Sequence, residues 1–163
     1  MKYLHLLILM MASCFATEAQ VVARVIDGDT YKVLLQGKIE TVRLLHVDAP
    51  ELDQDFGKAV KDSVTALLER QPVQLTLQGR DLYGRLLADV SINGQSLDSI
   101  LVTKGWAFFY AKYSKKYILS YYELTARAKS LGVWRCHDPV PPWQWRQLNA
   151  YYKRLYGGCR GVN

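Results

Sequence analysis

Cysteine and histidine are scarce in this chain of 163 residues, which contains three of each. No Cys-x-x-Cys or His-x-x-x-His pair occurs, so a structural zinc site is not expected, although His137 adjoins Cys136. The chain also has no internal repeat, no low-complexity linker and no apolar run long enough for a good membrane span. The composition is that of one globular domain, because half of the residues are hydrophobic and the chain is long enough to bury a core.

The first nineteen residues differ in character from the rest. Lys2 precedes an apolar run over residues 3–15, interrupted by His5 and Ser13, and Ala16-Thr17-Glu18-Ala19 follows. A positive start, a short apolar run and small residues before a cleavage point are typical of a secretory signal peptide. We therefore expect residues 1–19 to be a signal peptide, cleaved after Ala19 or, as a second choice, after Ala16. The protein would be exported, and either secreted or periplasmic.

Cys14 leaves a second form of export open. Met11-Ala12-Ser13-Cys14 resembles a weak lipoprotein box, so Cys14 could carry a lipid, and a membrane contact is expected only in that case. An N-terminal core helix is a further alternative, disfavoured because it would be apolar on every side. Once Cys14 is set aside, Cys136 and Cys159 remain as a pair. An oxidising compartment favours a disulfide between them.

Positive charge exceeds negative charge in this chain. There are 21 lysines and arginines against 15 aspartates and glutamates, a formal net charge of +6, and removal of residues 1–19 takes one base and one acid away. A small basic protein favours polyanions, and nucleic acids and anionic membrane surfaces are the usual ones. No stable protein partner is implied.

Short apolar and alternating segments predict a β-rich first half. Strands are expected over residues 21–35, in two segments broken at Asp27-Gly28-Asp29, and over 39–46, 73–77 and 86–92. Helical spacing of apolar residues predicts helices over about 55–70, 97–104 and 121–131. The order of these elements predicts an α+β, β-rich fold: a five-stranded, partly open barrel of OB type with about three packed helices and a C-terminal helical tail.

The end of the chain has a different composition. Residues 135–163, the C-terminal extension, contain three prolines and then Trp143 and Trp145. A helix is expected over 144–156, ended by Gly157-Gly158, and the tryptophans are expected to pack on the domain rather than to stack on bases. The predicted organisation is therefore a signal peptide at 1–19, a domain at 20–134 and an extension at 135–163.

Three short motifs carry acidic and basic side chains. They are Ile26-Asp27-Gly28-Asp29-Thr30, Arg43-Leu44-Leu45-His46-Val47-Asp48-Ala49-Pro50-Glu51 and Asp81-Leu82-Tyr83-Gly84-Arg85. Carboxylates can hold a hard cation, guanidinium groups offer a planar fork to phosphate oxygens, and a further carboxylate can orient or deprotonate a water. Together these groups predict a phosphodiesterase site.

In order and spacing, the three motifs resemble those of the staphylococcal (thermonuclease-type) nuclease family over about residues 21–134. Gly132-Val133-Trp134 and Pro-Pro-Trp-Gln-Trp-Arg at 141–146 also look like secreted or plasmid-borne bacterial members. One departure is that the segment between Glu51 and Phe56 is shorter than in the staphylococcal enzyme. The resemblance implies a calcium-dependent nuclease that hydrolyses phosphodiester bonds in DNA and RNA, with low sequence specificity and 3′-phosphate products.

The resemblance also assigns roles to particular residues. The implied calcium ligands are the carboxylates of Asp29 and Asp48 and the backbone carbonyl of Ala49. The implied catalytic side chains are Arg43, Glu51 and Arg85. The implied nucleotide-facing aromatic residues are Tyr83 and Tyr113, with Tyr110 as a third, less securely aligned candidate. An aromatic platform can stack on any base, which gives weak sequence preference.

Two other functions are compatible with the same residues. A non-catalytic nucleic-acid-binding OB-fold module is one, because some domains of this family keep the fold and lose the arginines and acids; all five matching side chains are present here. The other is an exported interaction or anchoring protein that works through its basic tail. His46 stands where an aliphatic residue is usual, and we expect it to be packed or partly exposed rather than a ligand.

Overall fold

The computed structural model describes residues 20–159, so the predicted signal peptide and Cys14 lie outside the described residues. The main strands are β1 (Gln20–Val25), β2 (Thr30–Leu35), β3 (Lys38–Leu44), β5 (Pro72–Arg80) and β6 (Leu86–Ile92). Three two-residue strands accompany them: β4 (Val47–Asp48), β7 (Gln95–Ser96) and β8 (Phe108–Phe109). The helices are α1 (Gly57–Leu68), α2 (Leu97–Thr103), α3 (Ile118–Ala128), α4 (Pro142–Trp145) and α5 (Ala150–Tyr156), with 3-10 turns at Ala111–Tyr113 and Gly132–Arg135.

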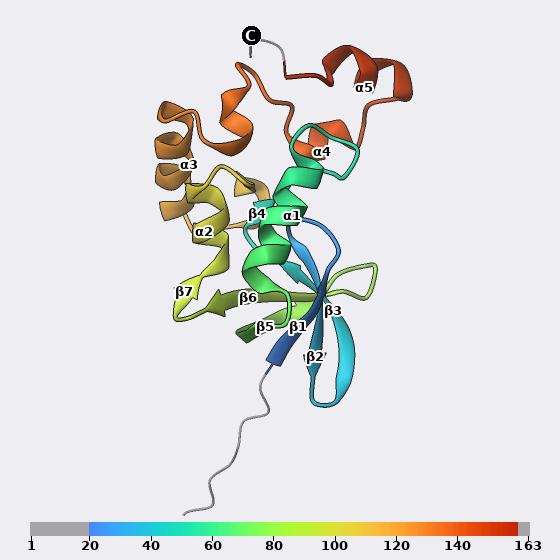
Figure 1. The fold of residues 1–163 in the computed structure, drawn as a ribbon, viewed down its shortest axis with the longest axis vertical. Coiled ribbons are helices and arrows are strands. Elements are labelled where there is room, and N and C mark those ends of the chain that lie inside the picture. Colours follow the sequence, from blue (N-terminus) through green and yellow to red (C-terminus); the bar gives the residue numbers. More distant parts are fainter. Residues whose placement is uncertain (1–19, 160–163) are drawn as a thin grey trace, which may run out of the picture.

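The five main strands form a closed barrel. They run in the order β3-β2-β1-β5-β6, with β7 at the end, and β3 also pairs with β6 in parallel, which closes the sheet on itself. Strands β2 and β3 pair in antiparallel register, with Thr30 opposite Arg43. Helices α1 and α2 pack on the barrel, with α3 beyond α2 (Figure 1). The predicted α+β fold with an OB-type barrel is therefore confirmed.

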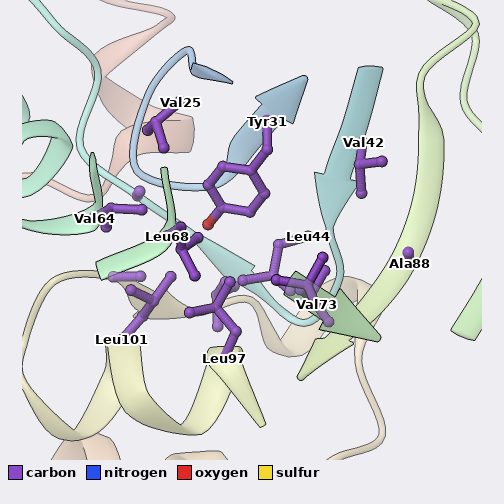
Figure 2. Packing of buried hydrophobic residues seen from close by; sticks show 14 of the residues in the cluster. Val25, Tyr31, Val42, Leu44, Val64, Leu68, Val73, Ala88, Leu97 and Leu101 are labelled. Carbon is purple, nitrogen blue, oxygen red and sulfur yellow. The ribbon is translucent and has the colours of Figure 1, made fainter. Parts of the chain in front are cut away.

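The core lies between the barrel and the first two helices (Figure 2). Helix α1 buries Val60, Val64 and Leu68, at the spacing that places residues on one face of a helix. Tyr31 is fully buried and donates a hydrogen bond from its hydroxyl group to the Gly28 carbonyl, 2.8 Å away. This bond ties the turn after β1 to the core. Within residues 20–159, no helix is both long enough and apolar enough to cross a membrane.

The prediction of a single helix over 144–156 is wrong. The structure has two short helices there, and Asn149 separates them by accepting a hydrogen bond from the Tyr152 amide, 3.0 Å away, as an N-cap. An asparagine side chain competes with helical backbone hydrogen bonds, so it favours a helix start over a helix interior. Helix α3 also ends earlier than expected, at Ala128, with Ser130 in the left-handed region at φ 49°.

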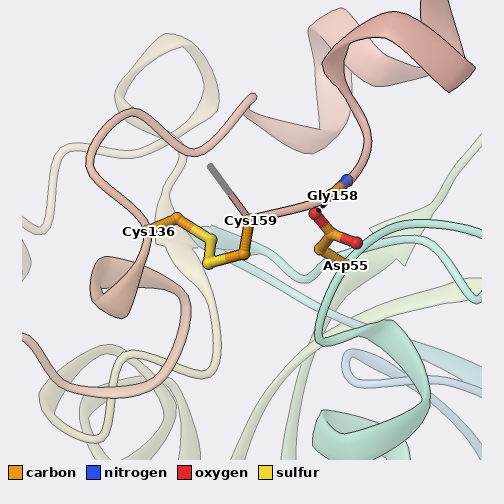
Figure 3. The surroundings of a disulfide bond; sticks show 4 residues. All are labelled: Asp55, Cys136, Gly158 and Cys159. Atoms are coloured by element: carbon orange, nitrogen blue, oxygen red, sulfur yellow. Dashed lines mark hydrogen bonds between the residues drawn. A yellow bond between two sulfur atoms is a disulfide. The ribbon is translucent and has the colours of Figure 1, made fainter. Parts of the chain in front are cut away.

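The C-terminal extension is closed by a disulfide between Cys136 and Cys159 (Figure 3). The bridge spans 23 residues, with the two Cα atoms 5.0 Å apart, and it encloses both α4 and α5. Beside it, the Gly158 amide donates to the Asp55 carboxylate at 2.7 Å. Trp145 is buried and Trp143 half-buried, as expected for tryptophans that pack on the domain.

Reduction of this disulfide should loosen the extension while the barrel stays folded. The chain-entropy model gives a loss on the order of 3 kcal/mol for a loop of this length, and both cysteines lie outside the barrel strands. Limited proteolysis with and without reductant, followed by mass mapping, should show faster cleavage within residues 137–158 in the reduced protein. Equal cleavage rates in that segment, or an equal acceleration in the barrel, would contradict this expectation.

Candidate active site

The turn between β1 and β2 packs closely against Ala49, the first residue after β4. A Cβ atom added at Gly28 would lie 2.6 Å from the Ala49 Cβ atom and 2.8 Å from the Val60 side chain, so the close approach requires glycine. This approach lets the Asp29 Oδ2 atom accept a hydrogen bond from the Ala49 amide at 2.7 Å. The predicted ligand residues Asp29 and Ala49, which lie 20 positions apart, therefore meet.

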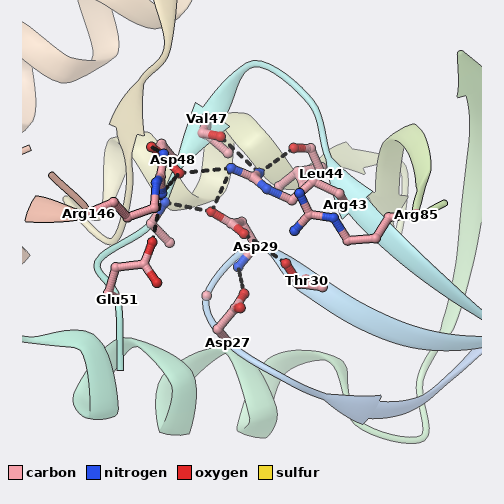
Figure 4. A network of polar contacts seen from close by, with 12 residues as sticks. Asp27, Asp29, Thr30, Arg43, Leu44, Val47, Asp48, Glu51, Arg85 and Arg146 are labelled. Carbon is pink, nitrogen blue, oxygen red and sulfur yellow. Dashed lines mark hydrogen bonds and ion pairs between the residues drawn. The ribbon is translucent and has the colours of Figure 1, made fainter. Parts of the chain in front are cut away.

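Arg43 lies between the two predicted metal-ligand aspartates (Figure 4). Its Nη2 atom is 3.1 Å from Asp29 Oδ2 and 2.9 Å from Asp48 Oδ1. The Nη1 atom donates to the carbonyl oxygens of Leu44 and Val47 at 2.6 and 3.0 Å. Both terminal nitrogen atoms of the guanidinium are therefore hydrogen-bonded. Aspartates from two separate motifs share the positive charge of Arg43.

Glu51 lies on a short loop before α1, which we call the Glu51 loop (residues 51–56). The loop is closed by Gln54, whose amide donates to the Glu51 carbonyl and whose side chain accepts from the Glu51 amide. A side chain at Gly57 would collide with the Glu51 carbonyl oxygen, so the loop folds directly back on the first residue of α1. The Glu51 carboxylate is about one-third exposed (35%), at the mouth of the site.

Arg85 lies at the same end of the barrel because it directly precedes β6, the strand that pairs with β3. The parallel pairing of β3 with β6 places Arg43 opposite Leu87, two residues after Arg85. The Arg85 Nε atom is 2.7 Å from Asp81 Oδ2, and the Asp81 Oδ1 atom accepts from the Arg85 amide at 3.0 Å. Figure 4 shows the Arg85 guanidinium directed toward Arg43 and Asp29. The structure therefore brings together all three sequence motifs.

One further side chain of this site was not predicted from the sequence. Arg146, from the C-terminal extension, places its Nη1 atom 2.7 Å from Glu51 Oε1 and its Nη2 atom 2.8 Å from Asp48 Oδ2. The Arg146 Nη1 atom also lies 3.2 Å from Asp48 Oδ1. Its signal was present in the Pro-Pro-Trp-Gln-Trp-Arg motif at 141–146, but nothing in the local sequence connects that motif with residues nearly one hundred positions earlier.

The electrostatics of the site favour a cation. Burial raises the pKa of Asp29 to about 6, although Arg43 opposes the shift, and burial also raises the pKa of Asp48. The hydrogen bond to Asp48 raises the pKa of Arg146. Five carboxylates (Asp27, Asp29, Asp48, Glu51 and Asp81) meet three guanidinium groups (Arg43, Arg85 and Arg146), which leaves a formal charge of −2. An all-oxygen donor set with two uncompensated charges fits a hard divalent cation such as calcium.

The raised pKa of Asp29 predicts a pH dependence for the calcium-free protein. The folded state keeps a proton on Asp29 up to about pH 6, whereas the unfolded state loses it near pH 3.9. Between these values the folded state binds more protons, so the contribution of Asp29 to the free energy of unfolding falls as pH rises. Relative to Asp29→Asn, the wild type should lose on the order of 1 kcal/mol between pH 5 and pH 7 in chelator, by chemical denaturation. A stability difference that is independent of pH would contradict the assignment.

The three candidate tyrosines differ in accessibility. Tyr83 and Tyr113 are 86% and 64% exposed, so each can offer a ring to a ligand. The half-buried Tyr110 instead stacks on Trp143, with ring centres 5.0 Å apart and planes 4° from parallel, and this contact covers one face of its ring. The β4–β8 pairing places Phe108 opposite Asp48, which brings Tyr110 close to the site strands.

A second group of possible cation ligands lies outside this site. One ligand atom from each of His46, Asp89 and Asp98 lies within 4.8 Å of the others. The Lys116 ammonium is 2.9 Å from Asp98 Oδ2 and 3.7 Å from Asp89 Oδ1, so these carboxylates already have a cationic partner. His46 is half-buried and its Nε2 atom lies 3.1 Å from Asp89 Oδ1.

Comparisons with known proteins agree with this geometry. A family model described as staphylococcal nuclease homologue matches residues 41–136. An uncharacterized endonuclease of Escherichia coli O157:H7 is 38% identical over 126 residues, which cover 77% of this chain and 82% of that protein. A similar endonuclease of Haemophilus influenzae is 37% identical over 77% of this chain and 71% of its own length. A micrococcal nuclease of Shigella flexneri is 36% identical over 78% of this chain and 80% of its own length.

The family match spans more than half of the chain and includes the segments that carry Arg43, Glu51 and Arg85. The resemblance inferred from the three motifs is thereby confirmed. The chain belongs to the staphylococcal nuclease family and is a hydrolytic nuclease, that is, a phosphodiesterase.

Proposed function

We propose that this nuclease depends on calcium and cleaves both DNA and RNA with low sequence specificity, leaving 3′-phosphate ends. The observation that supports this best is the buried arrangement of Asp29, Arg43 and Asp48, with Glu51 and Arg85 directed to the same end of the barrel. Carboxylates, guanidinium groups and one more exposed carboxylate are what hydrolysis of a phosphodiester requires.

In this proposal, Asp29 and Asp48 hold the calcium ion, together with the carbonyl oxygen of Ala49. The chemistry that a bound calcium supplies is stabilisation of negative charge on a phosphate oxygen. Asp29 and Asp48 are almost fully buried, which keeps competing water away from their carboxylates. Because Arg43 lies between them, its guanidinium is fixed before any substrate arrives and needs no rearrangement during the reaction.

The roles of the other site residues follow from how exposed their side chains are and where they point. Glu51 is accessible to solvent and would orient or deprotonate the attacking water. Arg43 and Arg85 would hold the phosphate, and Arg85 would also stabilise the departing 5′-oxygen. Tyr83 and Tyr113 expose aromatic rings that can stack on a base whatever its identity. Single-stranded or frayed substrate is preferred in this proposal, because an unstacked nucleotide must enter the site.

We also propose that the protein is exported by means of residues 1–19, with residues 20–134 as the nuclease domain and 135–163 as its extension. The support is the signal-like composition of the first residues and the disulfide between Cys136 and Cys159, which suits an oxidising compartment. Lipidation at Cys14 remains the alternative route of export.

A cleavage assay with end-group analysis tests the proposed activity. Single- and double-stranded DNA and RNA of equal length are incubated with the protein in calcium and in chelator. We expect calcium-dependent products from all four substrates, faster for single strands, with 3′ ends that a polymerase extends only after phosphatase treatment. Directly extendable 3′ ends would contradict the proposed bond cleaved. Binding without cleavage would favour the alternative, a non-catalytic nucleic-acid-binding module.

A further inference from the structure

The described part of the C-terminal extension, residues 135–159, is fastened to the Glu51 loop. The contacts join three side chains of this loop to backbone and side-chain groups of the extension: Asp53 with Trp145 and Lys153, Gln54 with the Val140 carbonyl, and Asp55 with the Gly158 amide. The hydrogen bonds from Lys153 and Trp145 lower the pKa of Asp53. The loop that carries the proposed water-handling carboxylate is therefore supported from outside by the extension.

Arg146 directly follows Trp145, which is buried and hydrogen-bonded to the Glu51 loop. Trp145 is 3% exposed, and its indole Nε1 atom donates to Asp53 Oδ1 at 2.9 Å. The Arg146 amide donates to the Pro142 carbonyl at 3.0 Å, which fixes the backbone from which the guanidinium extends. An arginine side chain whose backbone is already fixed loses less conformational entropy when its planar guanidinium binds a carboxylate.

The guanidinium groups of Arg43 and Arg146 divide the acids of the site between them. Arg43 binds Asp29 and the Oδ1 atom of Asp48, whereas the shortest contacts of Arg146 are with the other Asp48 oxygen and with Glu51. Within residues 20–159, Arg146 provides the one ion pair of the Glu51 carboxylate. Without Arg146, the formal charge of the cluster would fall from −2 to −3, and Glu51 would be free to turn away from Asp48 toward solvent.

We propose that Arg146 is a positioning residue of the active site, which holds the Glu51 carboxylate beside Asp48 so that it faces the attacking water. This inference rests on the role given to Glu51 in the proposed function. In this proposal the C-terminal extension contributes a side chain to the nuclease site. The extension nevertheless lies after the last barrel strand and mostly outside residues 41–136, which the family model matches.

The test compares Arg146→Ala and Arg146→Lys with Arg154→Ala as the matched control. Arg154 is an exposed arginine of the same extension, on helix α5. We expect Arg146→Ala to lower kcat by ~10–10², because misplacement of a reacting group by about 1 Å can cost that much. KM for an oligonucleotide should change little, Arg146→Lys should recover part of kcat, and Arg154→Ala should resemble the wild type. Calcium affinity, measured by calorimetry without substrate, should not weaken in Arg146→Ala, because the cluster becomes more negative.

A double-mutant cycle separates positioning from other roles. Arg146→Ala should have no further effect on kcat when Glu51 is already Gln, because the group through which it acts is gone. A full additional loss in that background would overturn the proposal. So would a faster enzyme on removal of Arg146, since the guanidinium would then obstruct the reaction centre.

The same set of proteins distinguishes this proposal from the function on which it rests. If Glu51→Gln is impaired and Arg146→Ala is not, the positioning role alone fails. If Glu51→Gln cleaves as fast as the wild type, the proposed role of Glu51 fails, and the inference drawn from it fails as well. Thermal melting of each variant shows whether a loss of kcat arises from unfolding.

Discussion

Turnover should fall by ~10²–10³ when Glu51 is replaced by Gln or Arg85 by Ala, because each change removes one preorganised contact to the transition state. Both side chains are about one-third exposed, so neither change creates a cavity or a buried unpaired charge. The melting temperature should therefore stay close to that of the wild type. For these two positions, lost activity then reports on chemistry and not on folding.

Arg43 requires a different substitution, because it neutralises two buried carboxylates. Removal of one partner from a buried ion pair costs ~3–5 kcal/mol, so Arg43→Ala should lose stability as well as activity. Arg43→Lys keeps the charge and loses the planar fork, so it should lower turnover while the protein still melts cooperatively.

Turnover and thermal melting are to be measured together for all four variants, with Arg154→Ala as a surface control. Near-wild-type turnover in Glu51→Gln and in both Arg85→Ala and Arg43→Lys would show that these motifs do not form the reaction centre. The same conclusion would follow if every loss of turnover matched the fraction of protein that is unfolded at the assay temperature.

Activity should be lost in chelator and restored by calcium, and this is the largest effect that we expect from any change of conditions. Asp29 and Asp48 offer hard oxygen ligands, and burial raises the pKa of both carboxyl groups. Calcium tolerates an irregular shell of carboxylate, carbonyl and water oxygens, whereas magnesium demands near-ideal octahedral geometry. Magnesium should therefore support much slower cleavage at equal concentration.

Asp29→Asn provides the matched control for the metal. It should weaken calcium binding in a titration without substrate, while the calcium-free protein should be at least as stable as the wild type at pH 7, because a buried charge has been removed. Full activity in chelator, or faster cleavage with zinc than with calcium, would reject the calcium assignment.

Part of this site could be predicted from the residues alone. The motifs around Asp29, Arg43 and Arg85 place carboxylates and arginines at strand ends, and the family to which they point is the one that the comparisons show. Residue type decides what a side chain can bind, so this part required no coordinates. By contrast, no sequence pattern predicts that Arg43 lies between the two aspartates, because that contact depends on how β2, β3 and β4 meet.

The sequence by itself determined the barrel strands, the first three helices and the chemical types of the site, because periodicity and turn residues act over a few positions. Tertiary structure alone decided the closing pair of β3 with β6, the cover of Trp143 on Tyr110 and the contact of Arg146 with Glu51, which joins residues 95 positions apart. Contacts at that separation depend on packing and charge complementarity between surfaces that exist only after folding. No local pattern encodes them, and the C-terminal extension could therefore be recognised in the sequence without its place in the active site.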